Sequence, residues 1–251
     1  MLITTKGLVL REKTLGENDK LLDILTDSLG LITVSAKGVK KANAKNAGTS
    51  QMFSYATFCV SKSKDRYIIN SSEPIRLFYD LRLDVEKFAL ASYFAELAMY
   101  TATPEQPNEG VLRLILNCLH FLSEGKKSNE LLKCIFEMRL MTEIGLVPNL
   151  IGCCECVTYS AQNMQFDLKY GKLYCENCCG ARDLRNFEVL DPTLLHAVRH
   201  IALTDMERLF SFKLSDEYMP LLANITERYV RIQLDKRFQT LDFYKILTNG
   251  N

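Results

Sequence analysis

Histidine, the residue used most often in acid–base catalysis, is scarce in the sequence. The 251 residues include only three histidines, His120, His196 and His200, and no tryptophan. His196 and His200 have metal-compatible i, i+4 spacing on a predicted helix, but no acid lies between them as in a zinc-protease motif. We interpret them as an ordinary helical face. The glycines are too widely spaced for a phosphate-binding loop, and no serine stands in a nucleophile elbow. We therefore predict that the protein is not an enzyme.

Long apolar segments and a secretion signal are also missing. Residues 1–7 contain no basic segment followed by an apolar core. The apolar stretch from Phe88 to Tyr100 is interrupted by Glu96 and is too short to cross a bilayer. We therefore expect a cytoplasmic protein with no membrane partner, in which cysteine thiols stay reduced.

Cysteine, by contrast, is abundant, with nine residues in all. Cys153 and Cys156 form one C-x-x-C pair, and Cys175 and Cys178 form another after eighteen intervening residues. Two such pairs can place four thiolates around one structural Zn2+ ion and leave no coordination site for a substrate. Two disulfides are the alternative, which a reducing compartment disfavours.

Two further cysteines stand beside these candidates. Cys154 is one residue short of the chelating spacing with Cys156, and Cys178 fits better than Cys179 because a glycine follows two residues later. Between the pairs, polar and apolar residues alternate over 165–170 and a Gly-Lys turn follows, which predicts a small β-ribbon.

Positive charge is concentrated near the start of the chain, although the net charge is only +1. Residues 1–80 carry twelve lysines and arginines against eight acidic residues, whereas the remainder carries nineteen against twenty-two. The segment from Ser28 to Lys64 contains six lysines and no acid. Phosphate-binding surfaces need local positive charge, so this segment is either a nucleic-acid surface or an ordinary solvated one.

Residues 1–80 have the pattern of a small β-barrel. Short alternating segments predict strands at 7–11, 21–26, 31–36, 55–60 and 67–70. The segment from Lys37 to Ser50 is too polar and too small in its side chains to pack, which predicts a long loop. Five short strands with one long loop favour an OB-fold, a small barrel that binds nucleic acid.

From Leu77 onward the spacing of apolar residues is helical. Helices are predicted over 85–101, 109–122 and 129–145, then from Pro192, and finally from a cap at 215–217 to about Lys236. The predicted fold is therefore α+β. An N-terminal OB-fold β-barrel spans 1–80, and a helical bundle over 81–251 carries a four-cysteine zinc-ribbon insertion at about 149–185.

The predicted loop has the chemistry of a phosphate-binding segment. Its lysines offer ammonium groups, and small neighbours leave backbone amides accessible. Aromatic side chains nearby can stack on bases where they face outward. The predicted DNA-binding residues are Lys37, Lys40, Lys41, Lys45, Arg11 and Phe53. The alternative for the loop is a flexible, solvated surface.

The order of several motifs resembles the RecO family of recombination mediators. The resemblance lies in Gly7–Arg11, Gly30–Ile32 and Ala36–Lys41, then in Phe136–Leu140 and in Gly145 to Pro148 just before the cysteine pairs. It covers nearly the whole chain and implies a bacterial DNA repair protein of the RecF pathway. Such proteins bind single- and double-stranded DNA, anneal complementary strands, and with their partner RecR help RecA to replace single-stranded DNA-binding protein (SSB).

The sequence departs from that family at two places. Met52 stands where a Gln-Pro-Phe motif has proline. Near the end, Thr240 and Asp242 stand where serine and a basic residue are common. The resemblance therefore does not extend a DNA-binding role to this tail.

The predicted helix 129–145 is a candidate site for SSB. The resemblance implies an SSB tail of acidic residues, Ile-Pro-Phe and a carboxylate, whose receptor needs an apolar cleft and a cation. Phe136 lies on an apolar stripe of this helix, with Lys133 and Arg139 beside it. We hypothesise that the tail docks there; the alternative places the stripe in the bundle core.

Two other classes of function stay open from the residues alone. A zinc-ribbon transcription or RNA-binding factor also needs a ribbon and a basic barrel, although the ribbon's acidic and basic residues balance each other. A structural scaffold that binds only protein is the third class. Salt-dependent oligonucleotide binding separates the scaffold from a DNA binder, and strand annealing separates a mediator from a transcription factor.

Overall fold

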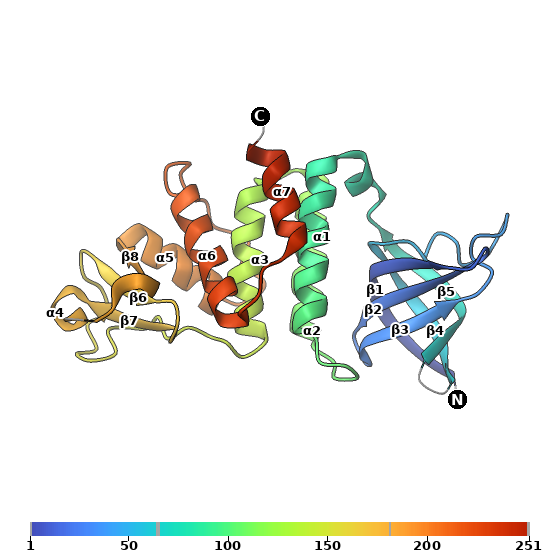
Figure 1. Cartoon of the computed structure of the whole chain (residues 1–251), viewed down its shortest axis with the longest axis horizontal. Helices are drawn as coiled ribbons and strands as arrows, with labels where there is room; N and C mark the ends of the chain where they lie inside the picture. Colours follow the sequence, from blue (N-terminus) through green and yellow to red (C-terminus); the bar gives the residue numbers. More distant parts are fainter. Residues whose placement is uncertain (1, 64–65, 181, 250–251) are drawn as a thin grey trace. The chain divides into compact units, whose positions relative to one another are not determined.

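The chain forms two compact units. The computed structural model describes residues 2–63, 66–180 and 182–249 (Figure 1). One unit comprises Met1–Lys126 with Phe238–Asn251, and the other comprises Lys127–Arg237. The second unit is therefore inserted into the first, and both ends of the chain belong to the first unit.

The first unit begins with a closed barrel of five strands (Figure 1). They are β1 (Leu2–Leu15), β2 (Asp19–Thr26), β3 (Gly30–Ala36), β4 (Ser54–Ser63) and β5 (Arg66–Leu77). Their order around the barrel is β1-β2-β3-β5-β4. β3 and β5 pair in parallel, whereas the other neighbours are antiparallel. This closed five-stranded order is that of an OB-fold, as predicted.

Inward-facing apolar side chains fill the barrel. Alternate residues of a strand point to the same face, and those of β3 alternate between buried and half-buried along its whole length. The buried cluster includes Val9, Ile24, Val34 and Phe58. Each such side chain contributes about 1.5–3 kcal/mol by leaving water. β1 is longer than the predicted strand and contains an irregularity between Val9 and Arg11.

Helices complete the first unit. They are η1 (Tyr79–Leu83), α1 (Val85–Thr101), α2 (Glu109–Glu124) and α7 (Gln239–Asn249). Asp84 and Asn108 cap α1 and α2 by accepting backbone N–H groups, and Gly125 ends α2 at φ 66°. The sequence analysis did not predict α7, which packs along α1.

The second unit combines three longer helices with the ribbon. The helices are α3 (Asn129–Glu143), α5 (Pro192–Leu203) and α6 (Met219–Leu234). The ribbon contains β6 (Met164–Asp167), β7 (Lys172–Cys175), α4 (Glu176–Cys179), η2 (Leu184–Asn186) and β8 (Phe187–Leu190), with strand order β7-β6-β8. The β6–β7 hairpin was predicted, and β8 was not.

The start of α6 differs from the prediction. Ser215 does not cap it, because the Ser215 hydroxyl bonds the Glu217 carboxylate and its carbonyl accepts the Tyr218 N–H in a separate turn. The helix begins at Met219, and its N-cap residue Tyr218 makes no side-chain cap bond.

The boundary between the predicted domains 1–80 and 81–251 lies within the first compact unit. The segment after α1 lies directly against the barrel, since Leu31 bridges to Pro104. A Cβ atom on Gly30 would lie 2.6 Å from the carbonyl oxygen of Gln106, so only glycine allows these two backbone segments to lie this close together. These contacts join α1 and α2 to the barrel in one unit.

Candidate metal centre and nucleic-acid interface

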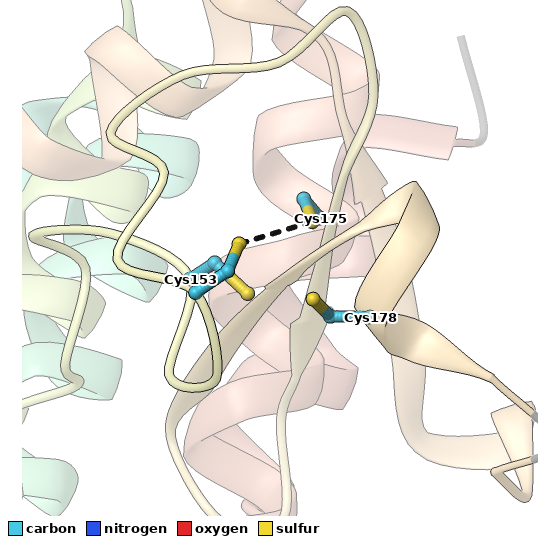
Figure 2. Close-up of side chains that lie close together, drawn as sticks. Cys153, Cys175 and Cys178 are labelled. Atoms are coloured by element: carbon cyan, nitrogen blue, oxygen red, sulfur yellow. Dashed lines mark hydrogen bonds between the residues drawn. The ribbon is translucent and has the colours of Figure 1, made fainter.

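The ribbon brings the four predicted cysteines together. Cys153 and Cys156 lie on a tight turn in which the Val157 N–H bonds the Cys153 carbonyl at 2.9 Å. Cys175 ends β7, and Cys178 lies one turn later in α4. Figure 2 shows the side chains of Cys153, Cys175 and Cys178 pointing toward a common centre. All four Sγ atoms lie within 4.8 Å of one another.

The donor set fits a tetrahedral thiolate site. With metal–sulfur bonds near ~2.3 Å, a tetrahedron places its sulfurs about 3.8 Å apart, and the Sγ atoms of Cys156 and Cys175 are 3.6 Å apart. The cysteines are free thiols, not disulfides. Four protein ligands would leave no position for a substrate, so such a site holds the ribbon together.

The neighbouring cysteines lie outside this cluster. Cys154 is exposed, and its Sγ accepts a long hydrogen bond of 3.9 Å from the Asn149 amide. Cys179 is buried. The geometry therefore favours Cys153 and Cys178 over these two alternatives, as the spacing predicts.

Hydrogen bonds shift the pKa values of two of the thiols in opposite directions. The Thr158 hydroxyl, 3.1 Å from Cys156 Sγ, is the main cause that lowers the pKa of Cys156 to about 6. Hydrogen bonding to the neighbouring sulfurs, Cys156 first, raises the pKa of Cys178 to about 12. A metal ion would release the remaining protons as it binds.

Two arginines that the sequence analysis did not identify hold the ligand-bearing segments. Arg199 on α5 donates to the carbonyls of Leu150 at 2.7 Å and Ile151 at 3.0 Å. Arg182 donates to the Cys179 carbonyl at 2.8 Å, and its guanidinium lies 4.2 Å from the centre of the Tyr174 ring. Guanidinium groups suit this role because one planar fork reaches several carbonyls.

His196 and His200 do not form a second metal site. Their ring centroids are 6.5 Å apart. The His200 ring lies 4.7 Å from that of Phe212, and its Nε2 is 3.2 Å from the Arg208 carbonyl. Within the described part of the chain, the cysteine cluster is the one group of three or more potential ligands with convergent atoms.

The segment between β3 and β4, named here the lysine loop (residues 37–53), exposes all four predicted lysines, Lys37, Lys40, Lys41 and Lys45. None of them forms an ion pair with a described acidic residue. Two other barrel cations are paired: Arg11 is 2.6 Å from Asp23, and Lys20 is 2.8 Å from Glu12. The lysine loop, by contrast, groups four exposed cations without such ion pairs on one segment.

The lysine loop is packed, contrary to the prediction that it is too polar and small to pack. Val39 is buried in the barrel core. The Asp19 carboxylate accepts the Gly38 N–H at 2.7 Å, and the Lys40 N–H bonds the Asn18 carbonyl at 3.1 Å. Local side-chain to backbone bonds of this kind replace regular secondary structure.

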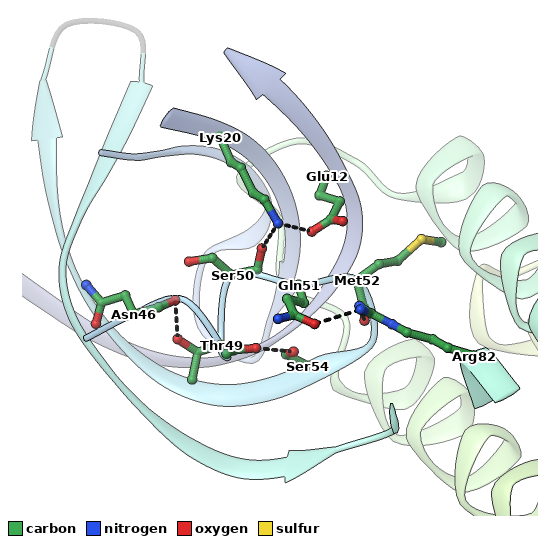
Figure 3. A network of polar contacts seen from close by, with 10 residues as sticks. Glu12, Lys20, Asn46, Thr49, Ser50, Gln51, Met52, Ser54 and Arg82 are labelled. Carbon is green, nitrogen blue, oxygen red and sulfur yellow. Dashed lines mark hydrogen bonds and ion pairs between the residues drawn. The ribbon is translucent and has the colours of Figure 1, made fainter. Parts of the chain in front are cut away.

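Hydrogen bonds also hold the far end of the lysine loop (Figure 3). The Thr49 hydroxyl is 2.5 Å from that of Ser72, which donates to the Asn46 side chain at 2.9 Å. The Ser54 hydroxyl donates to the Gly48 carbonyl at 2.9 Å. The four lysines therefore extend from an anchored backbone.

Phe53 cannot stack on DNA bases, which corrects its prediction. Its side chain is 0% exposed. The backbone at Phe53 has φ 64°, its N–H bonds the Val9 carbonyl at 2.8 Å, and its ring lies 5.7 Å from that of Phe88. The turn directs the ring into the first unit.

Of the predicted SSB-binding residues on α3, Phe136 and Lys133 are buried and Arg139 is only slightly exposed. Phe136 is fully buried, and Lys133 is 3% exposed. Lys133 Nζ lies 3.0 Å from Glu137 and 3.3 Å from Glu227 of α6. Arg139 pairs with Glu143 at 2.7 Å and also donates to the Thr204 carbonyl. The structure thus favours the bundle-core alternative for this stripe.

None of the described helices combines the length and apolar character needed to cross a bilayer.

The first unit contains an OB-type barrel with an exposed lysine loop, and the second contains helices and a four-thiol ribbon. Barrels of this class are typical of nucleic-acid-binding proteins. The chain matches the family "Recombination protein O N terminal" over residues 1–78 and "Recombination protein O C terminal" over residues 82–242. The chain belongs to the RecO family of DNA repair proteins.

Bacterial relatives align with nearly the whole chain. A DNA repair protein RecO of Acetivibrio thermocellus is 30% identical over 246 residues, covering 98% of this chain and 97% of that protein. One of Alkaliphilus metalliredigens is 30% identical over 247 residues, with 98% and 99% coverage. One of Bacillus pumilus is 31% identical over 210 residues, with 79% and 81% coverage.

Proposed function

We propose that this protein is a non-enzymatic, cytoplasmic recombination mediator. It binds single- and double-stranded DNA, anneals complementary strands and, together with RecR, helps RecA to replace SSB. Family membership supports the repair role, and the lysine loop supports the DNA-binding step. SSB, including its C-terminal tail, remains a proposed partner without an assigned surface on α3.

The observation that carries the proposal is the lysine loop itself. Four ammonium groups extend from one anchored segment and are not neutralised by described acidic side chains. Ammonium groups contact phosphates without reading sequence. Such contacts allow one surface to hold two strands of any sequence, which annealing requires.

The proposed metal is one structural Zn2+ ion held by Cys153, Cys156, Cys175 and Cys178. Zinc suits four thiolates because it accepts tetrahedral sulfur ligands and undergoes no redox change. Its binding would supply folding free energy to a ribbon too small to form a large core. The ion stabilises the ribbon and takes no part in chemistry.

The test is fluorescence-monitored annealing of complementary strands coated with SSB. The wild-type protein should accelerate annealing over SSB-coated strands alone. A variant with Lys37, Lys40, Lys41 and Lys45 replaced by alanine should lose most of this acceleration. A control with the same change in charge replaces four exposed lysines elsewhere, Lys126, Lys169, Lys172 and Lys213. Annealing at the uncatalysed rate with wild type would contradict the proposal.

A further inference from the structure

Phe53 is buried, so an aromatic side chain that stacks on a base beside the lysine loop has to be a different residue. Tyr79, the first residue of η1, is 42% exposed. A Cβ atom placed on Gly48 would lie 3.3 Å from the Tyr79 hydroxyl, so this ring stands against the lysine loop. Gly48 is three residues after Lys45, so their Cα atoms are at most about 11 Å apart.

The surroundings of Tyr79 are anchored on both sides. On the loop side, the buried Ser54 holds the Gly48 carbonyl. On the η1 side, Phe78 and Leu81 are buried, which fixes the short helix while leaving Tyr79 exposed. An aromatic ring on a fixed support loses little conformational freedom when a ligand stacks on it.

A cation lies beside the ring. The Arg82 guanidinium is 5.8 Å from the Tyr79 ring centre. It donates to the Gln51 side chain at 2.6 Å and to the Met52 carbonyl at 2.8 Å (Figure 3). Arg82 therefore links η1 to the end of the lysine loop and keeps positive charge next to the aromatic ring.

We propose that Tyr79, supported by Arg82, binds an unpaired nucleobase beside the lysine loop. This inference rests on the proposed DNA binding and adds the part of DNA that the site recognises. The lysines hold phosphates in single strands and duplexes alike, whereas only an unpaired base can present its face to Tyr79. The stacking contact gives this surface a preference for single strands. Arg82 is a positioning residue and a source of positive charge for the adjacent phosphate.

The test compares two ligands that differ only in their bases. Equilibrium binding is measured with an oligothymidylate and with an abasic deoxyribose-phosphate strand of the same length. Base stacking contributes about 1–3 kcal/mol per base, so wild type should bind the oligothymidylate at least about fivefold more tightly. Tyr79→Leu should bind both equally, while Tyr79→Phe keeps the preference.

The matched control is Tyr170→Leu. Tyr170 is an exposed tyrosine of the ribbon with the Lys169 ammonium 5.2 Å from its ring centre. This variant should keep the wild-type preference. Duplex binding and the salt dependence should be unchanged by Tyr79→Leu, since no phosphate contact is removed.

Three results would overturn the inference: equal binding of both strands by wild type, a preference that persists in Tyr79→Leu, or an equal loss of duplex and single-strand binding in Tyr79→Leu. In each of these cases, the proposed DNA-binding function would still be supported if DNA binding by the wild type depends on salt. A second measurement needs no variant. Photocross-linking of wild type to a single strand containing 5-iododeoxyuridine should modify Tyr79, and cross-links confined to other segments would count against the site.

Discussion

Neighbouring residues in this chain have very different surroundings. Cys153 contributes its thiol to the four-cysteine cluster, whereas Cys154 is exposed beside Asn149. Lys133 is buried between two carboxylates, while Lys126, seven positions earlier, is exposed. Such pairs allow each role to be tested against a closely matched residue.

Cys153→Ser should remove the metal, and Cys154→Ser should not. A hydroxyl in place of one thiolate breaks the ligand set, so zinc content should fall from about one ion per chain to near zero and the melting temperature should drop. Elemental analysis of protein purified under reducing conditions without chelator gives the metal content. DNA binding by the full chain should be retained in both variants. Metal-free wild type would contradict the assignment.

Replacing Lys133 should destabilise the second unit. Lys133→Met leaves Glu137, which is 0% exposed, without its cation. Breaking a buried pair in this way costs about 3–5 kcal/mol. Hydrogen exchange of α3 amides measures the loss, and Lys126→Met is the control, expected within about 0.5 kcal/mol. A change below about 1 kcal/mol at Lys133 would indicate that the cluster is freely solvated.

The stabilisation by Lys133 should not weaken as the pH rises near neutrality. Burial by itself lowers the pKa of Lys133, but the neighbouring charges, Glu137 first, raise it above its ordinary value. A raised folded pKa gives stability that is complete below the unfolded pKa of about 10.4 and is lost as pH rises through the folded value. The difference between wild type and Lys133→Met should therefore not shrink from about pH 7 to 9. A difference that shrinks within this range would contradict the pairing.

At the scale of elements, the lysine loop combines an anchored backbone with mobile charges. Asp19 and Ser54 hold its two ends, and the lysine side chains extend into solvent. The backbone therefore fixes where the four lysine side chains begin, and the side chains present positive charge to solvent.

Replacing Lys37, Lys40, Lys41 and Lys45 by alanine should flatten the salt dependence of DNA binding. Each phosphate contact contributes about −0.9 to the slope of log K against log salt for duplex DNA. Loss of four contacts should reduce the magnitude of the slope by up to about 3.6. Titrations at several salt concentrations measure this, with the four control lysines of the annealing test replaced in parallel. An unchanged slope would favour the flexible, solvated alternative for the loop.

The segment leading into α7 is a second element whose role can be tested. Phe238 is buried, with its ring 6.0 Å from Tyr93 and 5.6 Å from Tyr100 of α1, whereas Phe243 of α7 is half exposed. Phe238→Ala should destabilise the first unit by about 3–5 kcal/mol, and Phe243→Ala by less than about 1 kcal/mol. Hydrogen exchange of α1 amides distinguishes them, and equal effects would mean that α7 does not stabilise α1.

The sequence predicts those features that depend on local pattern. Alternation along β3 predicts its buried face, and the C-x-x-C spacing predicts the ligand set. Phe53 and Lys133 were misassigned because their environments come from distant partners, Phe88 and Glu227. The lysine loop packs through single hydrogen bonds, such as that from Gly38 to Asp19, which leave no periodic signal.

At the scale of the whole molecule, the chain leaves the first unit after Lys126 and returns to it at Phe238. The predicted helices before and after the ribbon have the same kind of apolar spacing, which does not reveal that α1, α2 and α7 belong with the barrel. Element types are encoded locally, whereas the grouping of elements depends on which apolar faces meet.

This return has a consequence for protein synthesis. A ribosome makes the barrel, α1 and α2 first, yet Tyr93 and Tyr100 lack their partner Phe238 until the segment after α6 has been made. The inserted unit can fold meanwhile, since its residues are contiguous. An interrupted translation product would therefore expose aromatic side chains on α1, the kind of surface that chaperones and proteases recognise. Residues 238–249 thus complete the first unit, because Phe238 packs against Tyr93 and Tyr100.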